Sequence, residues 1–184
     1  MDFKADIENL VERVKKKDVD AFGEVFDLFL TPIFRFVFFR LGHQQDAEDL
    51  TEEIFLKSWK NISFYQKKVN IPFSAWLFQI AKNTITDFYR QKNKKNTISL
   101  NENEIDKKSE NNVFKKTEND FDKKRIVQAL KKIPPLQADA VTLKFFCELS
   151  NQEIAQILKK SETAVRILQS RGLKKLKEII NETS

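Results

Sequence analysis

The chain has 184 residues and a formal net charge of +6, with 33 lysines and arginines against 27 aspartates and glutamates. Only three glycines and four prolines occur, too few for the many tight turns that a fold of short strands requires. This composition excludes collagen-like and Pro/Gly-rich disordered proteins. Hydrophobic residues make up 41% of the chain, enough for a core in one domain or two small ones. We therefore expect an all-α protein.

Cys147 and His43 are the only cysteine and the only histidine. Their number excludes an internal disulfide and a Cys/His metal site, which needs several ligands, and we expect neither a metal nor another cofactor. The most apolar stretch, residues 28–39, contains Arg35 and is shorter than the roughly 20 residues that span a membrane. The acidic start of the chain is unlike a signal peptide. We expect a cytoplasmic protein without stable membrane insertion.

The excess positive charge lies in the second half of the chain. Residues 1–91 contain 13 basic and 14 acidic residues, whereas residues 120–184 contain 13 basic and 8 acidic residues. Between them, residues 92–119 contain seven lysines and seven asparagines without a sustained apolar period, so this segment cannot bury a core. We predict two domains, 1–91 and 120–184, joined by a flexible linker over 92–119. The basic second half indicates either an anionic partner or a solvated basic surface.

Apolar residues recur at helical spacing in the first domain. Helices are expected over residues 7–14, 22–41, 46–61 and 73–91. Within the second of these, Pro32 is expected to break or kink the helix, and Gly42 is expected to end it. Asp46 is expected to be the N-cap of the third helix. Residues 62–72 form the loop before the last helix.

The second domain is expected to hold four helices, over residues 120–132, 135–146, 151–158 and 162–181. Ser150 with Glu153 forms a capping box, and Ser161 caps the last helix. Lys159 occupies a turn position that favours glycine, so a left-handed backbone is expected there. Only residues 159–161 separate the last two helices, and a turn of this length is typical of a helix-turn-helix.

The last helix has one basic, hydrogen-bonding face opposite its apolar stripe. The residues on that face are Thr163, Arg166, Ile167, Ser170 and Lys174, with Arg171 on the flank. Such a face suits the DNA major groove, where arginine pairs with guanine and apolar groups contact thymine methyls. Lys174, Lys175 and Lys177 would contact phosphates. The alternative is an ordinary helical hairpin with a solvated face.

The expected helix over 46–61 carries two acidic edges beside an apolar stripe. Asp46, Asp49 and Glu53 line one edge, and Glu48 and Glu52 line the other. Acidic edges beside apolar residues suit docking against a basic helical partner. A carboxylate metal site is the second interpretation and a solvated acidic face over the core is the third.

A polar face also runs along the expected helix over 73–91, formed by Gln79, Lys82, Asn83, Thr86 and Arg90. The preceding loop contains Phe64 and Tyr65 followed by Lys67 and Lys68. Interleaved aromatic and basic residues suit single-stranded nucleic acid, because bases stack on aromatic rings while lysines contact phosphates. Loops of this composition are common, so this pattern alone is a weak signal.

These three motifs occur in the order found in one known family. The run from Asp46 to Trp59, DAEDLTEEIFLKSW, closely resembles the core-binding segment of bacterial RNA polymerase sigma factors. The segment that begins Phe73-Ser74-Ala75-Trp76-Leu77 resembles the promoter-melting helix that follows it, and the helix-turn-helix is similar to the module that reads the upstream promoter element. With two domains and a short linker, the chain resembles the extracytoplasmic-function group of the sigma-70 superfamily.

The resemblance implies a role for each motif. The RNA polymerase core would be bound by Asp49, Leu50, Glu52, Glu53 and Phe55. The melted −10 element would be held by Lys67, Lys68, Gln79, Lys82, Asn83, Thr86 and Arg90. The −35 duplex would be contacted by Thr163, Arg166, Ser170, Arg171 and Lys174. The partners implied are polymerase core, promoter DNA and an anti-sigma factor, and the protein itself would not be an enzyme.

Two other classes of protein remain open at this point. A self-contained helix-turn-helix regulator would dimerise and bind a palindrome without polymerase. A helical enzyme would use the acidic cluster around Asp49 and Glu53, together with a bound metal.

Overall fold

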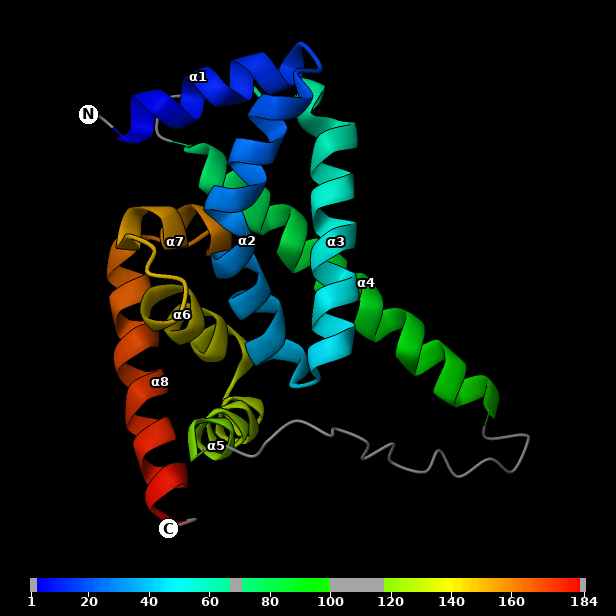
Figure 1. The fold of residues 1–184 in the computed structure, drawn as a ribbon. Helices are drawn as coiled ribbons and strands as arrows, with labels where there is room; N and C mark the ends of the chain where they lie inside the picture. The colour runs from blue at the N-terminus through cyan, green and yellow to red at the C-terminus, as the bar shows by residue number, and fades with distance from the viewer. Residues whose placement is uncertain (1–2, 67–70, 100–117, 183–184) are drawn as a thin grey trace.

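The computed structural model describes residues 3–66, 71–99 and 118–182, which form eight α-helices and one short 3-10 helix (Figure 1). The all-α fold predicted from the sequence is confirmed. The first group of helices comprises α1 (Phe3–Lys15), α2 (Val19–Leu41), α3 (Gln44–Asn61), η1 (Ile62–Phe64) and α4 (Phe73–Ser99). The second group comprises α5 (Glu118–Lys132), α6 (Pro135–Phe145), α7 (Asn151–Leu158) and α8 (Glu162–Glu182).

Helix α2 is continuous through Pro32. Of the two predicted outcomes, a break or a kink, the break is therefore wrong, and the kink stays a prediction. Proline has no backbone N–H, which leaves the carbonyl of Leu28, four residues earlier, without its helical donor. Leu28 is exposed, so water can supply that hydrogen bond. Apolar packing of Ile33 and Phe36 continues on the far side of the proline, which holds the helix together. The predicted end at Gly42 is confirmed, because its left-handed backbone (φ 76°) lets its N–H donate to the Phe38 carbonyl at 2.7 Å.

Helix α3 begins two residues before the predicted start. Its N-cap is His43, whose Nδ1 accepts a hydrogen bond from the Asp46 N–H at 3.3 Å. The prediction that Asp46 is the N-cap is therefore wrong. Asp46 lies in the first turn instead, where its negative charge faces the positive end of the helix dipole.

Helix α4 extends to Ser99, eight residues beyond the predicted end at Gln91. Residues 92–99 contain neither glycine nor proline, so nothing in them stops a helix that the packed turns before them have already nucleated. The first part of the predicted linker over 92–119 is therefore helical. Residues 100–117 lie outside the described part of the chain, and α5 begins at Glu118.

The helix-turn-helix of α7 and α8 has the predicted local geometry. Ser150 and Glu153 form the capping box, with the Glu153 N–H donating to Ser150 Oγ at 3.2 Å and the Ser150 N–H donating to Glu153 Oε2 at 2.9 Å. Lys159 adopts the expected left-handed backbone, with φ 53°. The Ala164 N–H donates to Ser161 Oγ at 3.2 Å, which confirms the cap of α8. These contacts set the angle at which α8 leaves α7.

The two groups of helices pack against each other, and we call this packing the closed arrangement. Helix α7 contacts α4, α6 contacts α2, and α5 contacts the end of α2 (Figure 1). A buried apolar cluster runs from the first group into the second and includes Phe36, Phe78, Leu143 and Ile154. The rings of Phe39 and Phe146 lie 4.0 Å apart across the contact. The sequence predicted the helices on each side but not this contact.

Polar bonds also join the two groups. Ser74 Oγ donates to Glu153 Oε1 at 2.5 Å, so the acid that caps α7 also holds the start of α4. Arg35 Nη1 donates to the Phe146 carbonyl at 3.2 Å. Cys147 is buried, and its Sγ donates to the Pro32 carbonyl at 3.4 Å. Burial raises the pKa of this thiol well above its ordinary value, which keeps it protonated.

Candidate polymerase and nucleic-acid interfaces

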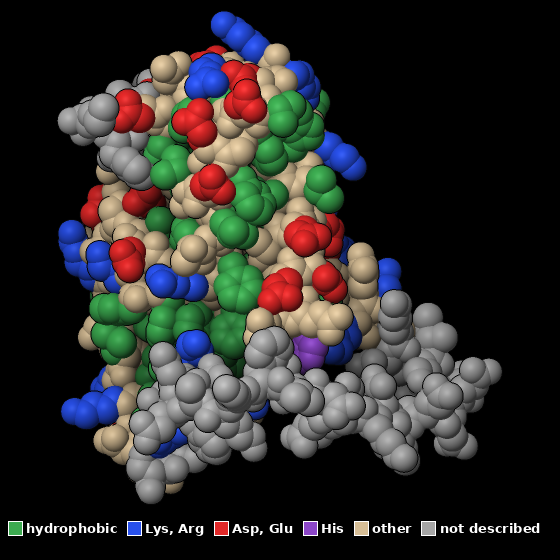
Figure 2. All heavy atoms as spheres, viewed as in Figure 1, with side chains coloured by type: hydrophobic (Ala, Val, Ile, Leu, Met, Phe, Trp, Pro, Cys, Tyr) green, Lys and Arg blue, Asp and Glu red, His purple; other side chains and the backbone are tan. Residues whose placement is uncertain are grey.

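The exposed side of α3 is acidic. Asp49, Glu52 and Glu53 all lie on this side, and Figure 2 shows acidic side chains over α3 next to apolar side chains over α2. Glu53 Oε1 pairs with Lys57 Nζ at 2.7 Å, whereas Asp49 and Glu52 have no ion-pair partner within the described residues. Two carboxylates are therefore available to a basic partner.

Leu50 and Phe55 do not share that exposed side. Both are buried in the core, where the Phe55 ring lies 4.6 Å from Phe26. In this arrangement the two side chains hold α3 in place and are not accessible to a partner. Leu56 was missed by the sequence analysis, although 59% of it is exposed. Its position seven residues after Asp49, two turns along the same face, is the signal that could have identified it.

The polar face of α4 is partly exposed. Asn83, Thr86 and Arg90 are exposed, whereas Gln79 and Lys82 are half-buried. Gln79 Nε2 donates to Asn83 Oδ1 at 3.0 Å, and Arg90 pairs with Asp87. These local bonds hold three of the five predicted side chains along one side of the helix.

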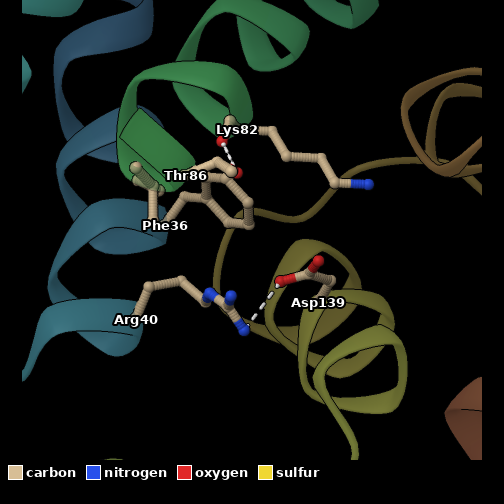
Figure 3. A pocket seen from close by; sticks show the side chains of 6 residues that line it. Phe36, Arg40, Lys82, Thr86 and Asp139 are labelled. Carbon is tan, nitrogen blue, oxygen red and sulfur yellow. Dashed lines mark hydrogen bonds and ion pairs between the residues drawn. The ribbon is translucent and has the colours of Figure 1, made fainter. Parts of the chain in front are cut away.

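Lys82 and Thr86 line a small cavity between α2, α4 and α6 (Figure 3). Its volume is about 30 Å³, and its other lining residues are Phe36, Arg40, Ile85 and Asp139. Asp139 comes from the second group of helices, its side chain is only 5% exposed, and its Oδ1 lies 3.3 Å from Arg40 Nη1. Burial raises the pKa of Asp139, while the positive charges of Arg40 and Lys82 oppose that rise. In the closed arrangement, α6 therefore lies beside this part of the α4 face.

The loop before α4 is only partly described. Lys67 and Lys68 lie outside the described residues. Phe64 is 77% exposed, which leaves its ring free to stack on a base. Tyr65 is buried and packs against Phe73 and Trp76. Of the two aromatic residues in the predicted loop, only Phe64 is therefore available to a ligand.

The predicted face of α8 is fully exposed. Its members are Thr163, Arg166, Ser170, Arg171 and Lys174. Helix α8 packs on α5, α6 and α7, and runs along the outer side of the molecule, away from α3 (Figure 1). Arg166 Nη2 lies 3.5 Å from Glu162 Oε2, and because both groups are exposed this pair is weak. Within the described residues, the face is therefore not covered by another helix.

Gln169 was also missed, because a polar residue on the buried side of α8 breaks the apolar pattern. It is buried, and its Nε2 donates to Asn151 Oδ1 at 2.9 Å. This bond joins the first turn of α7 to the middle of α8. It fixes the position of α8 on α7, and so the direction of the exposed face.

The structure also bears on the alternative of a carboxylate metal site and on membrane insertion. Within residues 3–66, 71–99 and 118–182, no group of three or more histidine, cysteine, aspartate or glutamate side chains could hold a metal ion. Among the same residues, no helix has the length and apolar character needed to cross a bilayer.

Comparison with known proteins gives two family matches, one in each half of the chain. The family described as sigma-70 region 2 matches residues 25–95, and the family described as sigma-70, region 4 matches residues 123–176. The first match contains α3 and most of α4, and the second contains the helix-turn-helix. Together they cover all three of the faces described above.

Individual relatives agree with these matches. The ECF RNA polymerase sigma factor BldN of Streptomyces coelicolor is 30% identical over 175 residues, which are 93% of this chain but only 64% of that protein. SigW of Bacillus subtilis, also an ECF RNA polymerase sigma factor, is 27% identical over 96% of this chain and 97% of its own length. The sigma factor RpoE of Bartonella quintana, solved with the anti-sigma factor NepR, has a similar fold, with a TM-score of 0.67 at 19% identity over 87% of this chain and 96% of that one. The chain belongs to the sigma-70 family and, within it, to the extracytoplasmic-function group of sigma factors.

Proposed function

We propose that this chain binds the RNA polymerase core and directs it to specific promoters. The observation that carries the proposal is the presence of region 2 and region 4 in one chain, each with an exposed face of suitable chemistry. BldN and SigW are RNA polymerase sigma factors by name. The chain itself would carry out no chemical step, because the polymerase supplies the catalysis. Its place of action would be the cytoplasm.

The acidic side of α3 would dock on the polymerase. Asp49, Glu52 and Glu53 lie one to two turns before the exposed Leu56 on the same side of α3, so an apolar contact is bordered by acidic charges. Charge complementarity at such a rim speeds association and orients the partner, while the apolar contact adds binding energy. The matching polymerase surface would be a helix with basic residues around an apolar position.

The two DNA-binding faces would act on different forms of the promoter. The exposed face of α8 would contact the −35 duplex through Thr163, Arg166, Ser170, Arg171 and Lys174, with Arg166 placed to pair with a guanine. The face of α4 would bind the separated −10 strand through Asn83, Thr86 and Arg90, with Phe64 stacking on a base. Because two weak sites on one chain raise each other's effective concentration, promoter binding would require both.

An anti-sigma factor would complete the set of partners. RpoE of Bartonella quintana was solved in complex with one. In this chain, such a partner would stabilise the contacts between the two groups of helices. These are the contacts of Ser74 with Glu153 and of Arg40 with Asp139. By holding the closed arrangement, it would keep α6 beside Lys82 and so keep the α4 face from the DNA.

Equilibrium binding with and without polymerase tests the proposal. The probe is a promoter fragment chosen from the 5′ ends of RNAs that increase when the chain is overexpressed, and the readout is fluorescence anisotropy. We expect weak, non-specific binding by the chain alone, and specific binding once purified core is added. Glu52→Lys should weaken core binding, whereas the control Glu178→Lys, an exposed acid on α8, should not. A dimer in sedimentation that binds a palindrome tightly without core would overturn the proposal in favour of a self-contained regulator.

A further inference from the structure

Ile167 is an exposed apolar residue on α8. It lies in the second turn after the helix begins at Glu162, and 46% of it is exposed. Isoleucine is β-branched and is a poorer helix former than lysine, glutamine or glutamate, and an exposed apolar side chain gains little from folding. Neither helix propensity nor core packing therefore explains an isoleucine at this position.

The neighbours of Ile167 belong to the proposed DNA-binding face. On a helix, residues three and four positions away share a face, so Thr163, Ser170 and Arg171 surround Ile167, and all three are exposed. The buried side of α8, with Val165 and Gln169, points into the domain. Ile167 is thus an apolar position inside a polar, basic surface.

The major groove offers one apolar group to such a position. Each base pair presents a distinct pattern there, and the C5 methyl of thymine is the apolar feature. In helix-turn-helix proteins, the N-terminal turns of the second helix contact base edges, and the second turn of α8 is where Ile167 lies. The hydrogen-bonding side chains beside it would read the polar edges of neighbouring bases.

We propose that Ile167 recognises a thymine by its methyl group in the upstream promoter duplex. This inference rests on the proposed function, in which α8 enters that duplex. Burying one methyl group is worth about a fourfold change in affinity. Ile167 would therefore set a preference for thymine at one position of the promoter.

Uracil in place of thymine tests the proposal, since it removes only the methyl group. The holoenzyme, assembled from core and this chain, is titrated against upstream duplexes in which each thymine in turn, on either strand, is replaced by uracil. With the unaltered chain, one replacement should weaken binding about fourfold. With Ile167→Ala, the same replacement should have no effect, and Ile167→Val should retain part of it.

Leu173→Ala is the matched control. Leu173 is 42% exposed on the same helix, but it lies about 9 Å further along the axis and on the opposite flank of the face. This variant should keep the full sensitivity to uracil. If no replacement affects the unaltered holoenzyme, or if Ile167→Ala remains sensitive, the inference is wrong while promoter binding still supports the proposed function. If the holoenzyme shows no promoter preference even with thymine, the proposed function fails as well.

Discussion

The two faces proposed to bind DNA differ in how accessible they are. The α8 face is exposed along its whole length, and α8 packs only on helices of its own group among the major contacts of the described chain. The α4 face is partly enclosed, because Lys82 and Thr86 line a cavity whose opposite wall carries Asp139. In the closed arrangement, the proposed duplex-binding face of α8 is therefore accessible, whereas Lys82 on the proposed strand-binding face of α4 lies beside α6. If the proposed function holds, we expect α8 to bind the duplex before α4 binds the separated strand.

Arg40→Ala should give the largest change, because it acts on the contact that encloses α4. Removing the guanidinium takes away the ion-pair partner of the buried Asp139 carboxylate and leaves only the more distant charge of Lys82, which we expect to destabilise the protein by about 2–4 kcal/mol. Urea unfolding measures the loss. The double variant Arg40→Ala/Asp139→Ala should be closer to the unaltered protein, since neither charge is left alone. Equal destabilisation of the single and double variants would show that the ion pair does not hold the two groups of helices together.

Gly172→Ala should damage the α8 side without altering any exposed side chain. An added Cβ would lie 2.7 Å from Val141 Cγ2 and 3.1 Å from the Gln137 carbonyl oxygen, so α8 would have to shift away from α6. Overpacking of this kind costs about 1–3 kcal/mol, measurable as a lower free energy of unfolding. Gly23→Ala is the control, because a Cβ there meets no atom within 4 Å and alanine favours a helix. If both variants had the same effect, close packing of α8 on α6 would not explain Gly172.

Arg166→Ala should weaken duplex binding while leaving α4 unaffected. If Arg166 pairs with a guanine, the loss is about 1–3 kcal/mol on the preferred upstream element and smaller on other sequences. Binding of the holoenzyme to upstream duplexes measures it, and single-stranded −10 oligonucleotides serve as the internal control. A loss of the same size on every duplex would mean that Arg166 contacts only phosphate.

Protonation of Asp139 should give the smallest effect, a pH dependence of the free energy of unfolding. Its pKa is raised above the ordinary value of 3.8 by burial, so the folded protein binds the proton more tightly than the unfolded chain. Relative to the permanently neutral Asp139→Asn, the unaltered protein should therefore gain stability as the pH falls through the raised pKa towards 3.8. Urea unfolding of both proteins across that range measures the difference. A difference that grows in the opposite direction would mean that pairing with Arg40 outweighs the burial of Asp139.

Local signals in the sequence predicted most of the helices. The start of α7 and the turn into α8 agree closely with the structure, because Ser150, Glu153 and Ser161 are caps that act within a few residues. Errors arose where packing outweighed local preference. Pro32 did not end α2, because apolar contacts continue beyond it. Helix α4 exceeded its predicted end, because no glycine or proline stops it before residue 99.

The candidate sites were also predictable to different degrees, because some follow from local helical spacing and others depend on packing between distant residues. The α8 face follows from helical periodicity alone, and the structure leaves all of its predicted members exposed. On α3, helical spacing separates Leu56, which points outward, from Leu50 and Phe55, which pack inward. Leu50 and Phe55 were expected to bind polymerase because of the family resemblance, which does not report burial. The contact of Arg40 with Asp139 joins residues far apart in the chain, and no pattern in a single sequence reports such a pair.

Run-off transcription with purified core polymerase tests the central claim most directly. The template carries a promoter identified from RNAs that increase when the chain is overexpressed. Core plus this chain should produce one transcript of defined length, which disappears when either the chain or the promoter is omitted. A transcript that forms equally without the chain, or no promoter-dependent transcript with it, would contradict the conclusion that this protein directs polymerase to promoters.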